Sequence, residues 1–415
     1  MSAWESLKTF YRIPWLRRLW VLQEVALSSS AIVLWGNTEV SWDIVGRASE
    51  VIQDDHNLWN AVDQRTGVGN AYLMHSLRNS NPPLHSFRTL LQRARRFETT
   101  DPRDRIFAVL GLSTTDRPTG DGTLFLEPDY TLTVPQLYLA VAQRIIESDQ
   151  NLGLLSAVQL RHRDLGLQKE MPTWVPRWNN FSVNILAGVD GKSHKVAAGL
   201  SVPDPVYSIK ESGFLVVHGL EIDVITRTTE KMAEDDFRLS DVLAKSHANS
   251  HLWRRRFDEL LNQPIEPHLK ALAWAMTAGK DWADEPIGNP ESHWLDFQMW
   301  WTSISLQNGC TLDPDGQCSH DDNGGNIKRF LVAASDCWDR RLFMTETGFI
   351  GLGPEVLRVG DRVCVLAGGP VPYILREGHE HYLFIGESYV YGIMEGEAVR
   401  LWREGRLSLK KIELH

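Results

Sequence analysis

The chain has 415 residues with 43% hydrophobic and 23% charged content, which is typical of a globular protein with room for two or three domains. Its net charge of −10 argues against nucleic acid as a partner, because a nucleic-acid binder needs a basic surface. No apolar run has the length of a membrane span, no signal-peptide pattern is visible and the four cysteines are too scattered for a disulfide framework, so we expect a cytoplasmic protein without a membrane partner.

The first informative segment reads Trp15-Leu-Arg-Arg-Leu-Trp20-Val-Leu-Gln-Glu24-Val25. Pro14 suits the first position of a helix, where its missing N–H has no helical partner. At 100° per residue this helix carries two apolar ridges, which predicts burial between layers. A narrow strip between the ridges holds Arg17 and Glu24, so Glu24 is expected to be a half-buried carboxylate one turn beyond the Trp20 indole. The alternative, which helix geometry alone favours, is a solvated or ion-paired face.

Residues 31–36 predict a strand that ends in a Gly36-Asn37 turn, and Ser41 predicts the cap of a helix over about 42–60. Residues 61–83 are polar and rich in turn-forming residues, which predicts a loop. A helix near 84–97 contains four arginines that form a positive patch: Arg88, Arg93, Arg95 and Arg96. The ordinary explanation of this patch is a solvated face paired with neighbouring acids.

Two more helices are predicted in the next fifty residues. Thr99-Thr-Asp101-Pro-Arg-Asp-Arg105 is a helix start with a capping residue, an early proline and an early acid, and this helix stops at Gly111. A Glu-Pro-Asp-Tyr turn ends at Tyr130. Thr133 and Gln136 then form a capping box for an amphipathic helix that extends to about residue 148.

The pattern changes beyond about residue 200. Strands are expected at 207–209 and 214–219, and helices at about 238–262, 267–279, 292–307 and 326–338, with a Gly/Asp/Asn-rich loop at 310–325. Short strands at 342–344, 348–351, 362–366, 373–376 and 382–386 follow. This spacing predicts a small antiparallel sheet or barrel.

Several of these segments, in their order along the chain, resemble the conserved blocks of the fungal heterokaryon incompatibility (HET) domain family. Arg18, Trp20, Gln23 and Glu24 match its R-x-W-x-x-Q-E helix. The Asp-Pro-Arg-Asp-Arg helix start and the Pro-Asp-Tyr turn also look like family sequence. So do Met171-Pro-Thr-Trp174-Val-Pro-Arg-Trp178 and the closing Gly392-Ile-Met-Glu-Gly396-Glu397. Arg177 stands where the family usually has an acid, so a charge contact there is not expected to carry over.

The resemblance implies an α+β chain with three parts. Residues 1–60 would be the C-terminal remnant of a TIR-like α/β HET domain, and 61–200 a helical connector. Residues 201–415 would form an α+β region with a β-rich subdomain at about 340–400. The family's early blocks, G-Y-x-A-L-S-Y-V-W-G and D-x-x-C-I-x-Q, are not in this sequence. The chain is therefore expected to be N-terminally truncated relative to the family.

The resemblance also implies a role in fungal non-self recognition or programmed cell death, with a protein partner or a homo-oligomer. A non-catalytic chain is expected, because the missing blocks would supply the nucleotide pocket and a catalytic group without its pocket positions nothing. The alternative is a TIR-like NAD-cleaving effector. Glu24, beside Trp20, would then stabilise positive charge at the anomeric carbon of the ribose. NAD would be its substrate, and no cofactor is expected.

Two groups of residues are candidates for a metal site. The first combines Cys310, Cys318, His320 and Cys337, but the seven-residue gap between the first two cysteines does not fit a zinc ligand pair. The second is His379-Glu-His381 with Asp361, for which an exposed polar hairpin is the simpler explanation. No metal is therefore expected.

Overall fold

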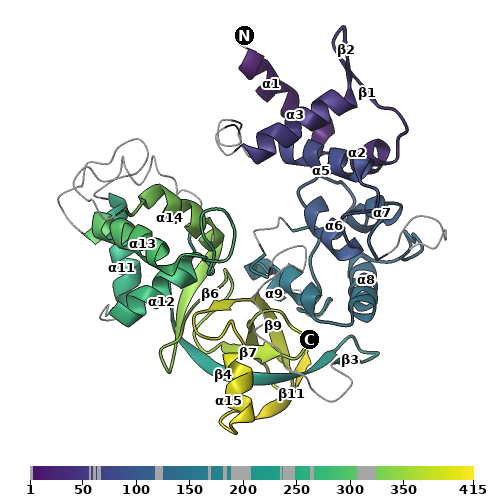
Figure 1. Cartoon of the computed structure of the whole chain (residues 1–415). Helices are drawn as coiled ribbons and strands as arrows, with labels where there is room; N and C mark the ends of the chain where they lie inside the picture. The colour runs from purple at the N-terminus through teal and green to yellow at the C-terminus, as the bar shows by residue number, and fades with distance from the viewer. Residues whose placement is uncertain are drawn as a thin grey trace. The chain divides into compact units, whose positions relative to one another are not determined.

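The computed structural model describes residues 3–415 except for 56–57, 59–61, 63–66, 117–124, 167–169, 181–184, 188–206, 234–235, 237–247, 262–265 and 306–323. The chain divides into two compact units, Met1–Ile145 with Arg177–Ser182, and Ile146–Pro176 with Val183–His415. Figure 1 shows the elements of both units. This division by compactness does not test the expected domain boundaries at residues 60 and 200, which stay predictions. Within the described residues, no helix combines the length and the apolar character that a membrane span requires.

In its described part, unit 1 is helical except for one hairpin. Its elements are α1 (Ala3–Tyr11), a 3₁₀ turn (Pro14–Arg17), α2 (Leu19–Ala26), β1 (Ile32–Trp35), β2 (Thr38–Ser41), α3 (Trp42–Asp54), α5 (Val68–Asn79), α6 (Phe87–Ala94), α7 (Asp104–Leu110) and most of α8 (Val134–Asp149). The Ser41 hydroxyl caps α3 by accepting from the Asp43 N–H, as predicted. The reciprocal capping box is also present, since Thr133 N–H donates to the Gln136 side chain and Gln136 N–H donates to the Thr133 hydroxyl.

The single helix predicted from Pro14 is wrong. The chain makes a 3₁₀ turn, is extended at Arg18 and only then enters α2. The interruption arises because Leu19 N–H donates to the Glu98 carbonyl and Glu98 N–H donates to the Arg17 carbonyl, at 3.0 and 2.6 Å. A bridge to a residue 80 positions away thus replaces local helical bonds. The two predicted ridges are lost with it, and α2 buries one broad face: Leu19, Val21, Leu22 and Val25.

The predicted loop at 61–83 is also wrong, because it contains α5. Gly67, taken as a loop signal, is the N-cap of this helix. A Cβ at that position would lie 2.7 Å from the Tyr11 carbonyl oxygen, so the glycine permits close packing and does not mark a turn. The apolar side of α5 is buried in the core of unit 1: Val68, Ala71, Leu73 and Met74.

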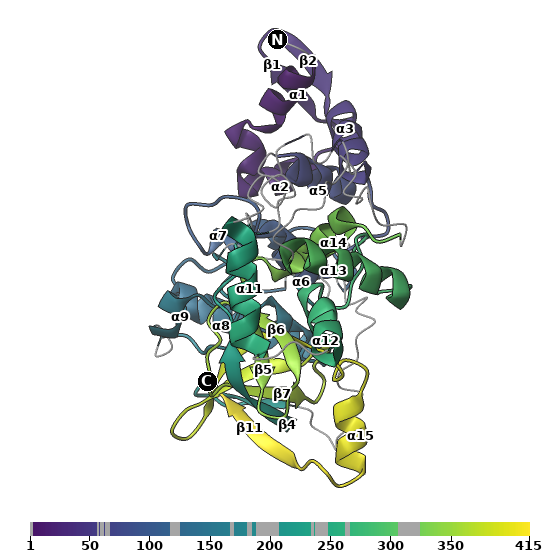
Figure 2. The ribbon, with the colours of Figure 1, turned by 90° about the vertical axis from the view of Figure 1, so that its left-hand side faces the viewer.

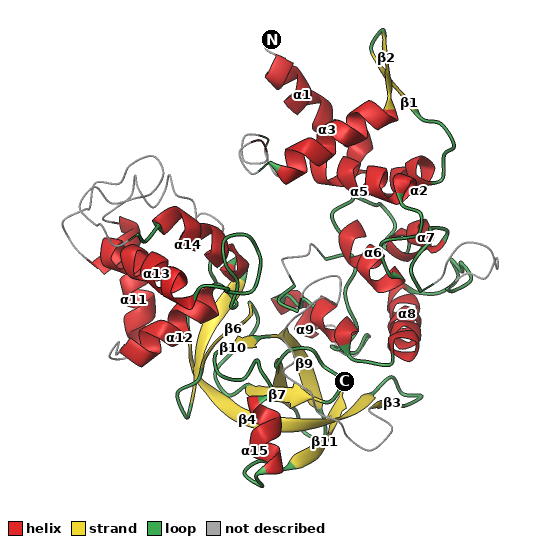
Figure 3. Cartoon of the chain, in the orientation of Figure 1, coloured by secondary structure: helices red, strands yellow, loops and turns green. Residues whose placement is uncertain are grey.

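Unit 2 contains most of the β-structure, as Figure 3 shows. Its strands are β3 (Tyr207–Ile209), β4 (Leu215–Thr228), β5 (Arg340–Thr345), β6 (Ile350–Pro354), β7 (Arg362–Leu366), β8 (Tyr373–Glu377), β9 (Tyr382–Glu387), β10 (Tyr389–Val390) and β11 (Leu409–Leu414). The order β10-β6-β5-β4-β11-β9-β8-β7 closes on itself, because β7 also pairs with β4. Strands β4, β7, β8, β9 and β11 therefore form a closed barrel, with one parallel contact between β9 and β11.

The expectation of an α+β chain with a C-terminal β-sheet or barrel is confirmed. The predicted strands 342–344, 362–366, 373–376 and 382–386 lie within β5, β7, β8 and β9. The sequence pattern did not predict β11. It predicted a strand at 214–219, which stops nine residues before the end of β4. Both strands are needed to close the barrel, since β11 pairs antiparallel with residues 215–220 of β4.

The helices of unit 2 are a 3₁₀ turn (Gly153–Ala157), α9 (His162–Gly166), α11 (Ala248–Leu261), α12 (Glu266–Met276), α13 (Pro290–Ser305), α14 (Ile327–Ala333), a second 3₁₀ turn (Ala334–Cys337) and α15 (Glu397–Arg403). Figures 1 and 3 show α11 to α14 gathered beside the β5–β6 part of the sheet. Ring-to-ring contacts join α11, α13 and α14 in one aromatic cluster: Trp253, Phe257, Phe297, Trp300 and Phe330.

Barrel closure by β11 gives a direct prediction. Leu414 is completely buried and Leu409 is half-exposed on the same strand. Leu414→Ala should lower the free energy of unfolding by about 2–5 kcal/mol, because it leaves a cavity in the barrel core. Leu409→Ala is the matched control and should cost much less. Denaturant unfolding followed by circular dichroism measures both, and equal losses would contradict the role of β11 in barrel closure.

Candidate functional site

The predicted catalytic pair lies on α2, and its geometry departs from the expectation. Glu24 is exposed, not half-buried, and among the described residues it has no hydrogen-bond or ion-pair partner. Trp20 is half-buried one turn earlier on the same helix. The expectation failed because it placed both residues on a continuous helix from Pro14, whereas the break at Arg18 sets a different face of α2 toward the core.

The other motif residues of this segment pack the framework. A Cβ on Gly111 would lie 2.5 Å from the Gln23 side-chain nitrogen, so Gln23 rests directly on the end of α7. Arg18 is exposed, and its backbone forms the bridge to Glu98. These residues bind α2 to the segment around α7, and they do not converge on Glu24.

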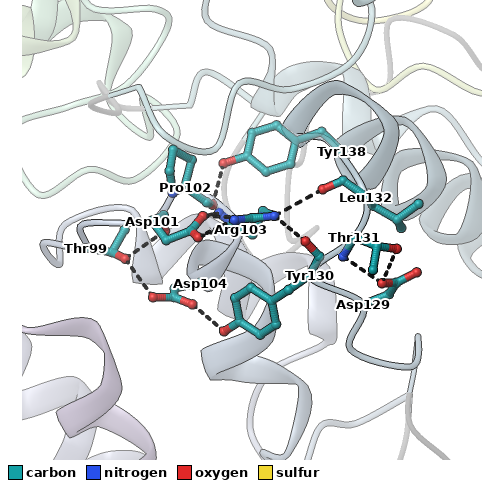
Figure 4. A network of polar contacts seen from close by, with 10 residues as sticks. All are labelled: Thr99, Asp101, Pro102, Arg103, Asp104, Asp129, Tyr130, Thr131, Leu132 and Tyr138. Atoms are coloured by element: carbon teal, nitrogen blue, oxygen red, sulfur yellow. Dashed lines mark hydrogen bonds and ion pairs between the residues drawn. The ribbon is translucent and has the colours of Figure 1, made fainter.

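A second family-like segment builds a polar network around Arg103, which Figure 4 shows. The Arg103 guanidinium donates two bonds to the Asp101 carboxylate, from Nε at 3.0 Å and from Nη2 at 2.7 Å. Its Nη1 donates to the carbonyls of Tyr130 and Leu132. The guanidinium also lies 5.3 Å from the centre of the Tyr130 ring. Arg103 of the Asp-Pro-Arg-Asp-Arg segment thus holds the Pro-Asp-Tyr turn in place, through backbone carbonyls and the Tyr130 ring.

The network is completed by two tyrosines. The Tyr130 hydroxyl donates to Asp104 at 2.6 Å, and the Tyr138 hydroxyl donates to the Pro102 carbonyl at 2.8 Å. Partial burial, together with the bond to Asp104, raises the pKa of Tyr130 to about 12. The bonds from the Arg103 side chain and N–H lower the pKa of Asp101. Tyr130 therefore stays protonated as a donor and Asp101 ionised as an acceptor, which is the arrangement of a structural clamp.

Arg95, predicted as part of a solvated positive patch, is instead buried. Its guanidinium donates to the carbonyl of Arg177 at 2.8 Å, to that of Asn180 at 3.3 Å and to the Gln92 side chain. Burial lowers the pKa of Arg95 to about 10. The expected solvated face is wrong for this residue, because Arg95 is buried, and its bonds to backbone carbonyls tie residues 177–180 to α6.

The two motif tryptophans are both buried. In unit 2, Trp174 Nε1 donates to the Gly213 carbonyl at 3.0 Å. In unit 1, Trp178 packs edge-on against Tyr138 with ring centres 5.0 Å apart. Each tryptophan therefore anchors the unit in which it lies.

The closing motif shapes the turn before α15. Gly392 and Gly396 have φ values of 84° and 80°, which favour glycine because a side chain would be strained there. Gly396 is the N-cap of α15, and the Glu397 carboxylate accepts a bond from the Glu395 N–H at 2.7 Å. These residues start a helix, and their geometry explains their presence without a ligand.

Sequence reasoning missed one of the most buried charges of unit 2. Glu387, at the end of β9, is 1% exposed and accepts from Arg340 Nη2 at 2.7 Å. It also accepts the backbone N–H of Leu186 at 2.7 Å and that of Ala187 at 3.3 Å. No pattern in the sequence predicts this group, because its partners lie 47 and about 200 residues away. One carboxylate thus joins β5, β9 and residues 186–187.

The candidate metal ligands that the structure describes do not come together in a site. Asp361 is buried, and it accepts two bonds from the Arg376 guanidinium at 2.7 and 2.9 Å. His379 is exposed, and the His381 ring lies edge-on to that of Phe214 and tilted against that of His415. Cys337 is buried, its thiol donates to the Met276 carbonyl, and burial raises its pKa. Cys310, Cys318 and His320 lie outside the described residues, among which no metal-binding cluster is found.

Comparison with known proteins gives two matches. The Het-6 beta-barrel domain family matches residues 318–406. Heterokaryon incompatibility protein 6, OR allele, of Neurospora crassa is 24% identical over 447 aligned residues, which cover 92% of this chain. Both matches support the resemblance to the HET family. It spans 64% of the length of the Neurospora protein, and no solved structure matches it.

The match to the barrel family can be placed on the structure of this chain. Residues 318–406 contain β5 to β10 and α15. Strands β4 and β11, which close the barrel, lie before and after that range. The folded barrel of this chain is therefore larger than the matched segment. The TIR-like origin of the N-terminal part stays a prediction.

The buried Glu387–Arg340 pair predicts a large effect of a small change. Glu387→Gln keeps the size of the side chain but removes the buried negative charge that pairs with Arg340, so the free energy of unfolding should fall by about 3–5 kcal/mol. Glu377→Gln is the matched control, because Glu377 is 58% exposed in its ion pair with Arg362 and its loss should cost under about 1 kcal/mol. Chemical denaturation of the full chain distinguishes the two, and a Glu387 variant as stable as the control would refute the assignment.

The lowered pKa of Asp101 predicts a pH dependence. The ordinary aspartate pKa is about 3.9, so the stabilisation from ionised Asp101 is complete above that pH and is lost as pH falls through the lower folded-state pKa. Asp101→Asn should be less stable than wild type near neutral pH, and the difference should shrink below about pH 4. Thermal unfolding across pH measures this. Glu24→Gln, which removes an exposed carboxylate, is the control, and an unchanged difference at acid pH would count against the clamp.

Proposed function

We propose that the chain acts in fungal non-self recognition, as a non-catalytic member of the HET family. The observation that carries the proposal is the extent of the similarity to heterokaryon incompatibility protein 6, which covers 92% of this chain and is not confined to the barrel. Apart from Glu24, the described family-motif residues are engaged in packing, capping and backbone bonds, which supports a framework that presents surfaces to a partner. Programmed cell death would be the outcome of that recognition.

The geometry of Glu24 supports the non-catalytic part of the proposal. A carboxylate that stabilises a developing positive charge needs a water-excluded site and neighbouring groups that position the substrate. Glu24 is exposed and without a described partner, and Gln23 and Arg18 serve the contacts of α2. NAD cleavage through Glu24 is the alternative that the experiments must separate.

The function is tested by expressing the full chain in one of two otherwise isogenic fungal strains with complementary auxotrophic markers. Expression should reduce the yield of viable heterokaryons relative to the empty vector. Glu24→Ala should act like wild type, and the destabilised Leu414→Ala should lose the effect in proportion to its lower abundance. Heterokaryons as viable as those with the vector would overturn the proposed role.

The enzymatic alternative has its own measurement. Purified full chain incubated with NAD should release no nicotinamide above a no-protein blank. Release that Glu24→Ala abolishes, while the fold measured by circular dichroism is kept, would overturn the non-catalytic assignment and establish Glu24 as a catalytic residue.

A further inference from the structure

The exposed large hydrophobic side chains of the described residues are concentrated in one segment of the sequence. Of the ten large hydrophobic side chains that are exposed in the described residues, six lie between residues 27 and 51: Leu27, Ile32, Leu34, Trp35, Ile44 and Val51. Isolated exposed apolar residues are normal, but a concentration of this kind marks an interaction surface. Its centre is the β1–β2 hairpin, which Figures 1 and 2 show projecting from the helices of unit 1.

The two faces of the hairpin differ. On one face, Trp35 packs edge-on against Phe10 of α1 with ring centres 5.3 Å apart, and Val33 and Val40 are half-buried. On the other face, Ile32 and Leu34 are 62% and 71% exposed. A two-stranded hairpin is marginally stable in water by itself, so additional pairing partners would stabilise it.

The outer edge of β1 has open hydrogen-bonding groups. Trp42 N–H donates to the Ala31 carbonyl, and Ile32 is aligned with Ser41 and Leu34 with Glu39. Because pairs alternate along an antiparallel ladder, the N–H and C=O groups of Ile32 and Leu34 point away from β2. Among the described residues no backbone bond reaches them. This edge therefore presents the donors and acceptors that an added strand needs.

Charge decides which strand could be added. β1 reads Ile-Val-Leu-Trp and carries no charge, so it can pair with a second copy of itself without repulsion. The β2 edge carries Glu39, and self-pairing there would bring two copies of that carboxylate together. We propose that two copies of this chain associate through the outer edges of β1, in antiparallel register about Val33, to form the four-stranded sheet β2-β1-β1-β2.

This register gives hydrogen-bond partners to the backbone groups of the β1 edge and also covers its exposed side chains. Ile32 of one copy exchanges backbone bonds with Leu34 of the other, and Val33 lies opposite Val33 in the non-hydrogen-bonded pair at the two-fold axis. Four exposed side chains, Ile32 and Leu34 from each copy, then share one face and cover one another. The other face carries the two Val33 side chains.

The oligomeric state of the full chain tests the proposal. Wild type should sediment as a dimer between 1 and 100 µM protein (about the range in which moderate self-association is seen). Leu34→Lys places a charge on the pairing edge and should weaken the dimer at least about tenfold. Asn37→Lys is the matched control, because it adds the same charge at the hairpin turn and should leave the dimer intact. A monomeric wild type, or a dimer that Leu34→Lys does not weaken, would overturn the proposal.

A cross-link tests the register. In a background of Cys310→Ser and Cys318→Ser, Val33→Cys should form an intermolecular disulfide under mild oxidation, because facing Cα atoms of a non-hydrogen-bonded pair lie about 4.5 Å apart. The two buried native thiols, Cys337 and Cys364, remain in place. Asn37→Cys is the control at the far end of the hairpin. Cross-linking of Val33→Cys no faster than that of Asn37→Cys would overturn the register about Val33.

Discussion

Strand β4 is the constraint on which unit 2 depends. Its 14 residues pair with β3 and then β7 on one edge, and with β11 and then β5 on the other. The register shifts near residues 221–223 and 225–227 let one strand leave the barrel and enter the second sheet. β11 and β7 both approach β4 closely at Gly219, since a Cβ there would be 2.8 Å from Ile412 of β11 and from Leu366 of β7. The barrel and the β5–β6–β10 sheet are therefore built on one segment.

Buried charges fix the rest of the barrel. Glu387 and Asp361 are each paired with an arginine and each also accepts backbone N–H bonds, from residues 186–187 and from Arg358 respectively. An unpaired charge in such a position would be strongly destabilising, so wrong pairings of these strands are penalised. In unit 1, Arg95 and Arg103 act on backbone carbonyls in the same way, and they hold connecting segments to the helices. In each case a charged side chain holds a loop in place through hydrogen bonds to the backbone of that loop.

The features that could be predicted from the sequence are those that depend on residues close together in the chain. The Ser41 cap, the Thr133–Gln136 capping box and strands β5, β7, β8 and β9 follow from residues close in the chain, and the structure confirms them. The sequence could not predict the break at Arg18, because the partner is Glu98, nor the exposure of Glu24 that results from this break. The helix α5 was not predicted because Gly67 was read as a turn signal, whereas its role is close packing against Tyr11 and Leu16. The residues of β11 do not alternate regularly between polar and apolar, so the strand is recognised only from its pairing with β4.

Family-motif residues thus build the framework of each unit, and β4 is the centre of unit 2. Hydrogen–deuterium exchange of the full chain, resolved to peptides, tests the claim for β4 most directly. We predict that peptides within 215–228 are among the slowest to exchange, while peptides over 38–41 exchange faster, because β4 is paired on both edges and β2 is a short strand paired with β1 on one edge. Exchange in 215–228 as fast as in 38–41 would contradict it.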